Sequence, residues 1–172
     1  KIIHVQRNPI DIVYSWMGKG YGGEFYTNKR SSDSLVYKYQ NEIIPHFAIG
    51  WEDDYLNLSG VDRIIYMIDK IRKKHLDSFN GLSKLQKNQI LFISFEKLTL
   101  STSQVIPEVT NFLNTQVSEF TSKILLDERC PREYDPQSKM MKLNAIQAKV
   151  SKLSFELLMN MNKDFEENDI VI

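Results

Sequence analysis

The first sixteen residues constrain the fold most, because a short apolar run passes directly into a well-marked helix start. Residues 1–6 are rich in β-branched side chains and predict a buried strand. Asn8 is suited to cap a helix, Pro9 to occupy its first position, and Asp11 to return a capping bond from the third. The apolar side chains that follow repeat at helical spacing, which predicts a helix face packed on a sheet. The segment therefore indicates an α/β fold.

A second apolar run predicts that the sheet is parallel. Residues 89–95 carry four consecutive apolar side chains and read as another buried strand. Helical periodicity separates the two runs and is clearest at 61–76. We therefore expect three layers, with a parallel sheet between helices on both faces. Further helices are expected at 49–58, 104–113, 115–126 and 142–168, mixed helical periodicity at 35–47, and loops at 24–34 and 127–138.

Composition limits the class of protein. The 172 residues, 42% of them hydrophobic, can bury one core, so we expect a single domain over residues 1–172. Lys and Arg together number 22, as do Asp and Glu, which argues against a general nucleic-acid binder. Cys130 has no partner for a disulfide or a zinc site, so no metal is expected and a reducing compartment is favoured. No apolar run approaches the length of about 20 residues that a membrane helix needs.

An arginine at the end of the first strand suggests anion binding. Arg7 would stand at the carboxyl end of a buried strand beside a helix N-terminus, which is a common anion site in α/β sheets. Ser15 follows two helical turns later and could donate to the same anion. Spacing alone equally allows Arg7 to pair with Asp11, and Ser15 to bond only a backbone carbonyl.

The same stretch carries a family resemblance. An apolar strand, Arg-Asn-Pro, an acidic residue soon after, and a serine eight positions beyond the arginine are all present in residues 1–16. This pattern resembles the 3′-phosphate-binding segment of the sulfotransferase family. The resemblance implies a sulfotransferase fold similar to that of P-loop NTPases, with 3′-phosphoadenylyl sulfate as co-substrate. It also implies that Arg7 and Ser15 bind the 3′-phosphate.

Two later segments extend the resemblance. Residues 90–98 are similar to the family's later strand with its aromatic-acidic-x-Leu ending, and Phe95 stands where cytosolic members often have a tyrosine near the adenine. The alternative for Phe95 is a plain core residue, because buried aromatic side chains near strand ends mostly serve in packing. The charged loop at Cys130–Glu133 is the segment most comparable to the family's Arg-Lys-Gly loop. It makes Arg132 a candidate contact to the 3′-phosphate, with an ordinary solvated arginine as the alternative.

Two parts of the family's catalytic machinery are not found in this sequence. The phosphosulfate loop and the catalytic base are expected upstream of residue 1, so the chain is expected to be the C-terminal part of the domain, inactive when expressed alone. Lys19-Gly20 is not that loop, because it follows the wrong motif. His4, His46 and His75 are each expected to be structural or exposed.

The resemblance implies transfer of a sulfuryl group to a hydroxyl or amine of a carbohydrate or small molecule, without a metal, a nucleic acid or a membrane segment. The expected compartment is the cytoplasm, or the Golgi lumen if a longer chain carries an anchor. A non-catalytic module that binds nucleotide or glycan is the alternative. A nucleotide kinase would need a glycine-rich loop ending in Lys-Ser or Lys-Thr, which we do not find. Trp51, Tyr55 and the aromatic residues of 21–39 fit either a sugar site or the core.

Overall fold

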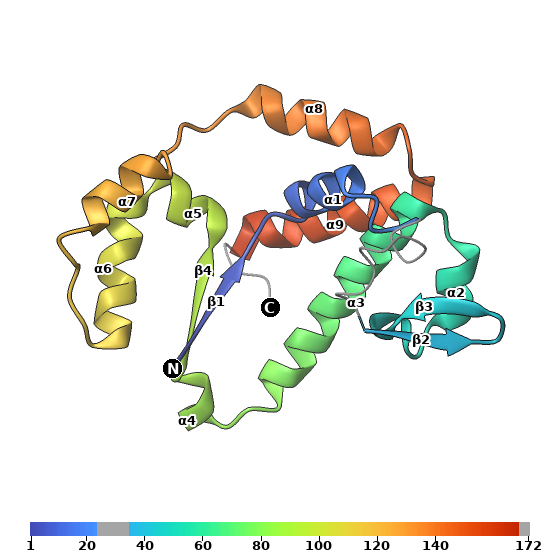
Figure 1. The fold of residues 1–172 in the computed structure, drawn as a ribbon, viewed down its shortest axis with the longest axis horizontal. Coiled ribbons are helices and arrows are strands. Elements are labelled where there is room, and N and C mark those ends of the chain that lie inside the picture. Colours follow the sequence, from blue (N-terminus) through green and yellow to red (C-terminus); the bar gives the residue numbers. More distant parts are fainter. Residues whose placement is uncertain (24–34, 169–172) are drawn as a thin grey trace.

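The computed structural model describes residues 1–23 and 35–168. The loop predicted at 24–34 lies outside the described residues, as do the aromatic side chains within it. The elements, in chain order, are β1 (Ile2–Gln6), α1 (Pro9–Gly18), β2 (Val36–Tyr39), β3 (Glu42–Pro45), the 3₁₀ turn η3 (His46–Ala48), α2 (Glu52–Asn57), α3 (Gly60–Asn80), α4 (Lys84–Lys87), β4 (Ile90–Ser94), α5 (Phe95–Leu100), α6 (Thr102–Leu113), α7 (Thr121–Asp127), α8 (Pro136–Gln147) and α9 (Lys152–Asn168) (Figure 1).

The two apolar runs pair as predicted. β1 and β4 are parallel neighbours, in a register that sets Ile2 opposite Ile90 and Gln6 opposite Ser94. The start of α1 also follows the prediction, because the Asn8 side chain accepts a hydrogen bond from the Ile10 N–H and Pro9 opens the helix. The chain is therefore a mixed α/β structure with a small parallel sheet.

The expectation of a three-layer sheet is not confirmed. Among the described residues, β1 and β4 form a two-stranded sheet, and β2 and β3 form a separate antiparallel pair. The prediction that β1 is a buried strand is wrong, since Ile2 is 58% and Val5 50% exposed. The physical reason is that β1 pairs with β4 on one side, while the described helices bury most of their apolar surface against one another.

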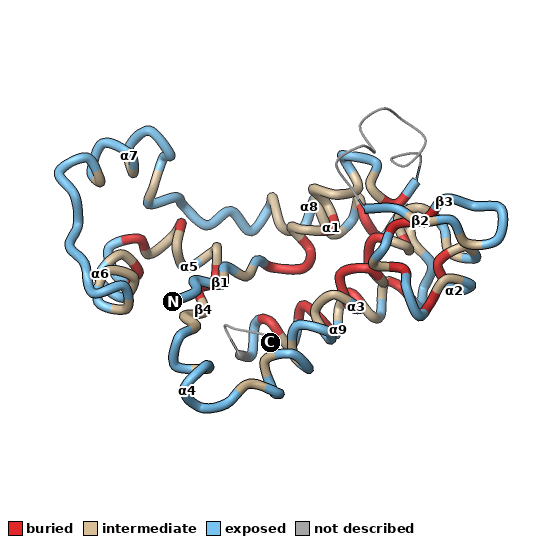
Figure 2. Tube along the Cα trace, turned by 60° about the horizontal axis from the view of Figure 1, so that its bottom comes forward, coloured by how far each residue is buried: buried red, intermediate tan, exposed pale blue. Residues whose placement is uncertain are grey.

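Helices supply most of the core. The main cluster joins α1, α3, α8 and α9, and Figure 2 shows buried segments gathered where α1 and α3 meet. Ile65 of α3 and Val13 of α1 are fully buried there, together with Leu158 of α9. A second cluster packs β3, η3 and α2 on α3. The long helix α3 contributes to both clusters and so connects the two halves of the core.

Four local elements differ from what the sequence predicted. Most of the predicted helical segment 35–47 is the β2–β3 hairpin, in which Val36 to Tyr39 alternate in burial and Gln40 takes a positive φ of 52° at the turn. α5 was not predicted, although Ser94 caps it by accepting from the Lys97 N–H at 3.1 Å. α7 begins at Thr121, later than the predicted residue 115, and α8 begins inside the predicted loop.

The length and apolar character of the described helices bear on membrane insertion. None of those within residues 1–23 and 35–168 combines the length and the apolar character that crossing a bilayer requires. The compartment stays a prediction.

Candidate functional site

Arg7 and Phe95 meet at one edge of the parallel sheet. β1 and β4 run in the same direction with Gln6 opposite Ser94, so the residues that follow each strand emerge side by side. The guanidinium carbon of Arg7 lies 4.9 Å from the centroid of the Phe95 ring. This distance is within the range of a cation–π contact, and it orients an otherwise exposed arginine side chain.

Arg132 approaches the same ring from a distant part of the chain. Its guanidinium carbon lies 5.8 Å from the Phe95 centroid. The backbone N–H of Arg132 donates to the Thr99 carbonyl at 2.7 Å, and the Thr99 hydroxyl donates to the Phe95 carbonyl at 3.0 Å. Helix α5 therefore carries the aromatic ring and also holds the loop that brings Arg132 to it. Arg132 and Arg7 thus approach the same ring, and the contact of Arg132 with the 3′-phosphate stays a prediction.

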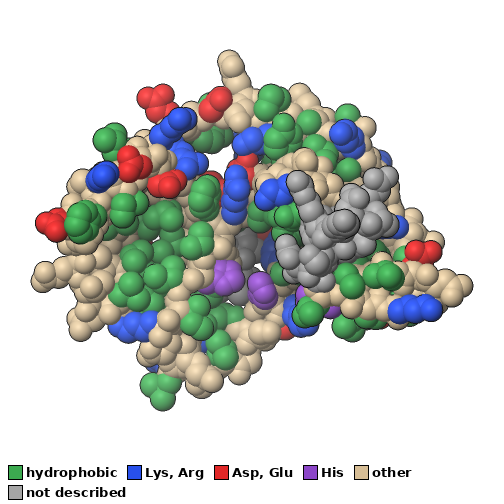
Figure 3. Space-filling model, viewed as in Figure 1, with side chains coloured by type: hydrophobic (Ala, Val, Ile, Leu, Met, Phe, Trp, Pro, Cys, Tyr) green, Lys and Arg blue, Asp and Glu red, His purple; other side chains and the backbone are tan. Residues whose placement is uncertain are grey.

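A cavity of about 560 Å³ lies beside these residues. Its walls come from the end of β1, the start of α1, helix α5, the loop at 132–135, helix α8 and the end of α9. In the space-filling view, Lys and Arg side chains gather around the opening beneath α8 (Figure 3). Sites for drug-sized ligands and nucleotides usually measure about 300–1,000 Å³. The cavity has room for a nucleotide.

Two of the three lysines that line this cavity, Lys139 and Lys142, are neutralised by carboxylates. Lys142 pairs with Asp11 at 2.6 Å, and Lys139 pairs with Glu166. The hydrogen bond from Lys139, helped by one from Asn162, holds the pKa of Glu166 below its usual value. In the described part of the chain, no carboxylate forms an ion pair with Arg7 or Arg132. Two guanidinium groups without a carboxylate partner therefore lie against one ring, and guanidinium groups are suited to bind phosphate.

The pairing of Asp11 also decides between two interpretations of the sequence. Asp11 neither returns a capping bond to the helix start nor pairs with Arg7. Its carboxylate forms an ion pair with Lys142 of α8 instead. Arg7 remains available to a ligand. The capping role predicted for Asp11 is wrong.

Ser15 is placed apart from this pair. It lies half-buried two turns along α1, and its carbonyl accepts a bond from the Lys19 N–H at 3.2 Å. It does not line the 560 Å³ cavity that Arg7 and Arg132 share. Its contact with the 3′-phosphate stays a prediction.

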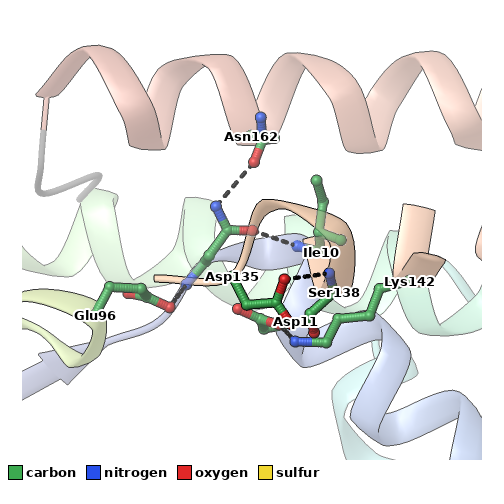
Figure 4. A network of polar contacts seen from close by, with 8 residues as sticks. Ile10, Asp11, Glu96, Asp135, Ser138, Lys142 and Asn162 are labelled. Carbon is green, nitrogen blue, oxygen red and sulfur yellow. Dashed lines mark hydrogen bonds and ion pairs between the residues drawn. The ribbon is translucent and has the colours of Figure 1, made fainter. Parts of the chain in front are cut away.

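Asn8 connects the Arg7 turn to two other helices. Its backbone N–H donates to Glu96 Oε1 and its Nδ2 donates to Asn162 Oδ1, both at 2.9 Å (Figure 4). The sequence predicted only the capping role of Asn8. Glu96 belongs to the aromatic-acidic-x-Leu ending of residues 90–98, which was a weak signal in the sequence. No sequence signal pointed to Asn162.

Trp51 and Tyr55, two of the aromatic candidates for a sugar site, belong to the core. Trp51 is 7% and Tyr55 2% exposed, and both pack in the second cluster. The Trp51 indole N–H donates to the Phe47 carbonyl at 2.8 Å. The structure therefore favours the core interpretation for both residues.

None of the three histidines lines the 560 Å³ cavity, although His4 and His75 line a second cavity together with Arg7. His4 and His75 contact edge to face at 5.7 Å, and this second cavity is mainly apolar and measures about 230 Å³. Burial, and then the neighbouring His75, lowers the pKa of His4. His46 approaches the Leu35 carbonyl at 3.3 Å. Within the described residues, no group of three or more His, Cys, Asp or Glu side chains could hold a metal ion.

Comparison with known proteins gave one match. The family model described as "Sulfotransferase domain" matches residues 1–164, so the match starts at the first residue and is not confined to a C-terminal part of the chain. Neither the curated proteins nor the solved structures gave a match. The expectation that further parts of the domain lie upstream stays a prediction. With 164 of its 172 residues matched, and an arginine placed at the end of its first strand, the chain belongs to the sulfotransferase domain family.

Proposed function

We propose that the protein binds 3′-phosphoadenylyl sulfate and that Arg7 and Arg132 together hold its 3′-phosphate. The observation that carries the proposal is the convergence of both guanidinium groups on the Phe95 ring, beside a cavity large enough for a nucleotide. Membership of the family supports sulfuryl transfer in general.

The chemistry of the donor set fits a phosphate. A guanidinium group can give two parallel N–H bonds to phosphate oxygens, and its charge does not change near neutral pH. Phe95 limits the directions that the two groups can take, which lowers the entropy lost on binding. Ser15 is proposed as a neutral donor that adds less.

The reaction implied is transfer to a hydroxyl or amine of a carbohydrate or small molecule. The bond from sulfur to the phosphate oxygen of the donor breaks, a bond from sulfur to the acceptor oxygen or nitrogen forms, and the acceptor's proton passes to a base. Adenosine 3′,5′-bisphosphate is the second product. Because anchoring of the 3′-phosphate stabilises the ground state and the transition state alike, the arginines act on donor affinity more than on the chemical step.

Titration calorimetry with adenosine 3′,5′-bisphosphate tests the proposal. Arg7→Ala should lose about 1.5–3 kcal/mol, or roughly 10- to 150-fold in affinity, and Arg132→Ala about 10-fold. Ser15→Ala should lose about 0.5–1.5 kcal/mol. Lys123→Ala, on the exposed surface of α7, is the control and should bind like the wild type.

Adenosine 5′-monophosphate provides the second comparison, because it lacks the 3′-phosphate. The wild type should prefer the bisphosphate, and Arg7→Ala should lose that preference. Wild-type affinity in both arginine variants would refute the proposed site. Tight bisphosphate binding without transfer, in the longest natural form of the protein and with sugar and phenol acceptors, would favour the non-catalytic module instead.

A further inference from the structure

A network of hydrogen bonds connects the segment after Arg7 with helix α9. It begins at Asn8, which follows Arg7 directly and is 8% exposed. The Asn8 backbone N–H donates to Glu96, the residue after Phe95. This hydrogen bond therefore joins the two segments that carry the cation and the ring, right beside their contact. Glu96 is itself oriented, because its Oε2 accepts from the Ser94 hydroxyl at 3.2 Å.

The side chain of Asn8 extends this network of hydrogen bonds to helix α9. Its Oδ1 accepts from the Ile10 N–H, and its Nδ2 donates to Asn162 Oδ1 at 2.9 Å. Asn162 is 4% exposed, and its side chain also helps to lower the pKa of Glu166, the partner of Lys139. A buried amide that loses its partner is costly, so this set of contacts favours one arrangement of the turn.

The geometry points to Asn162 as a positioning residue: through Asn8 it holds the turn that aims Arg7 at the Phe95 ring, and it thereby sets the affinity of the anion site. The ligand part of this inference rests on the proposed function. Asn162 does not line the 560 Å³ cavity and acts through another residue. Arg7 is exposed, so its aim depends on where the backbone of Asn8 lies. A bidentate contact to phosphate tolerates little displacement of that backbone.

A ligand-free measurement tests the positioning directly. Protons of the Arg7 side chain that lie over the Phe95 ring should show a ring-current shift in the NMR spectrum of the full chain, and Phe95→Leu should abolish it. Asn162→Leu should move these signals toward the values of a free arginine. Asn160→Leu, on an exposed position of the same helix, is the matched control and should leave them unchanged. Unchanged Arg7 signals in folded Asn162→Leu would overturn the inference.

Affinity for adenosine 3′,5′-bisphosphate gives the second measurement. Asn162→Leu should weaken binding by about 3- to 10-fold, whereas the same change in an Arg7→Ala background should have no effect. An equal loss in both backgrounds would overturn the inference, because a merely structural defect does not depend on Arg7. If Asn162→Leu does not fold, Asn162→Ser removes the same hydrogen bond and is measured with the same two expectations.

The two failures can be told apart. A wild type that binds no bisphosphate, but whose Arg7 signals depend on Asn162, would refute the proposed function and leave the positioning role intact. A wild type that binds the bisphosphate, with an Asn162→Leu variant identical to it in both measurements, would refute only the positioning role.

Discussion

Asp62 lies between the starts of two long helices, and its substitution tests how the core is assembled. The side chain is nearly buried, at 6% exposure. Its Oδ2 accepts from the hydroxyl of Ser59, the cap of α3, at 2.5 Å. Its Oδ1 accepts from the Ser151 N–H at 2.9 Å, and Ser151 in turn accepts from the Ser154 N–H in the first turn of α9. One carboxylate therefore ties the N-termini of α3 and α9 together.

The magnitude follows from these contacts. A hydrogen bond to a charged group contributes about 1.5–3 kcal/mol, and the positive end of each helix adds about 0.3–1 kcal/mol. Asp62→Asn keeps the size and one acceptor oxygen but removes the charge, so the free energy of unfolding should fall by about 1–3 kcal/mol. Asp62→Ala also leaves the Ser151 N–H without its acceptor and should cost about 2–4 kcal/mol.

The effect of Asp62→Asn on the free energy of unfolding should depend on pH. Burial acts to raise the pKa of Asp62, but the hydrogen bonds from Ser154, Ser59 and Ser151 outweigh it, so the pKa lies below its ordinary value. The stabilisation is therefore complete above the unfolded pKa of about 3.9 and is lost as the pH falls through the lower folded value. The difference between the wild type and Asp62→Asn should be full at pH 7 and should shrink below about pH 4.

Urea unfolding followed by circular dichroism, at pH 7 and at steps down to about pH 3, measures this difference. Asp77→Asn, at an exposed position of the same helix, is the control and should change the unfolding free energy by less than about 0.5 kcal/mol. Equal stability of the wild type and Asp62→Asn at pH 7 would refute the reasoning. So would a difference that keeps its full size at the lowest pH.

Three further outcomes are expected. Trp51→Ala should lower the unfolding free energy by about 3–5 kcal/mol in the same denaturant assay, because the ring is buried in the core. An unchanged unfolding free energy would contradict the core role and make Trp51 a candidate contact to the acceptor again. Gly22→Ala should cost about 1–3 kcal/mol or more, since a Cβ there would lie 1.5 Å from the Gly60 carbonyl oxygen, whereas Gly23→Ala meets nothing within 4 Å and should have little effect on the melting temperature. Phe95→Leu should weaken bisphosphate binding in calorimetry while Phe95→Tyr preserves it, and equal binding by both would show that the ring does not orient the arginines.

The parts of the fold that the sequence predicted correctly depend on residues close together in the chain. A β-branched run followed by Asn8 and Pro9 predicts a strand and a capped helix, because both signals act within a few residues. The parallel pairing of β1 and β4 followed from two apolar runs joined by helices. The sequence therefore predicted correctly that Arg7 directly follows a strand. The β2–β3 hairpin was misread, because four-residue strands offer too little alternation to outweigh a helical pattern.

What the sequence left open depends on which surfaces meet in three dimensions. Helical spacing placed Trp51 and Tyr55 on one face, but only the packing of α2 against α3 decided that this face is core. The sequence left Arg132 as either a phosphate contact or an ordinary solvated arginine, and only the tertiary hydrogen bond from its N–H to the Thr99 carbonyl brings it to the Phe95 ring. Asn162 gave no signal at all. Its hydrogen bond to Asn8 joins residues from opposite ends of the chain, and such a contact is set by the packing of α9 on α1 and not by any local preference.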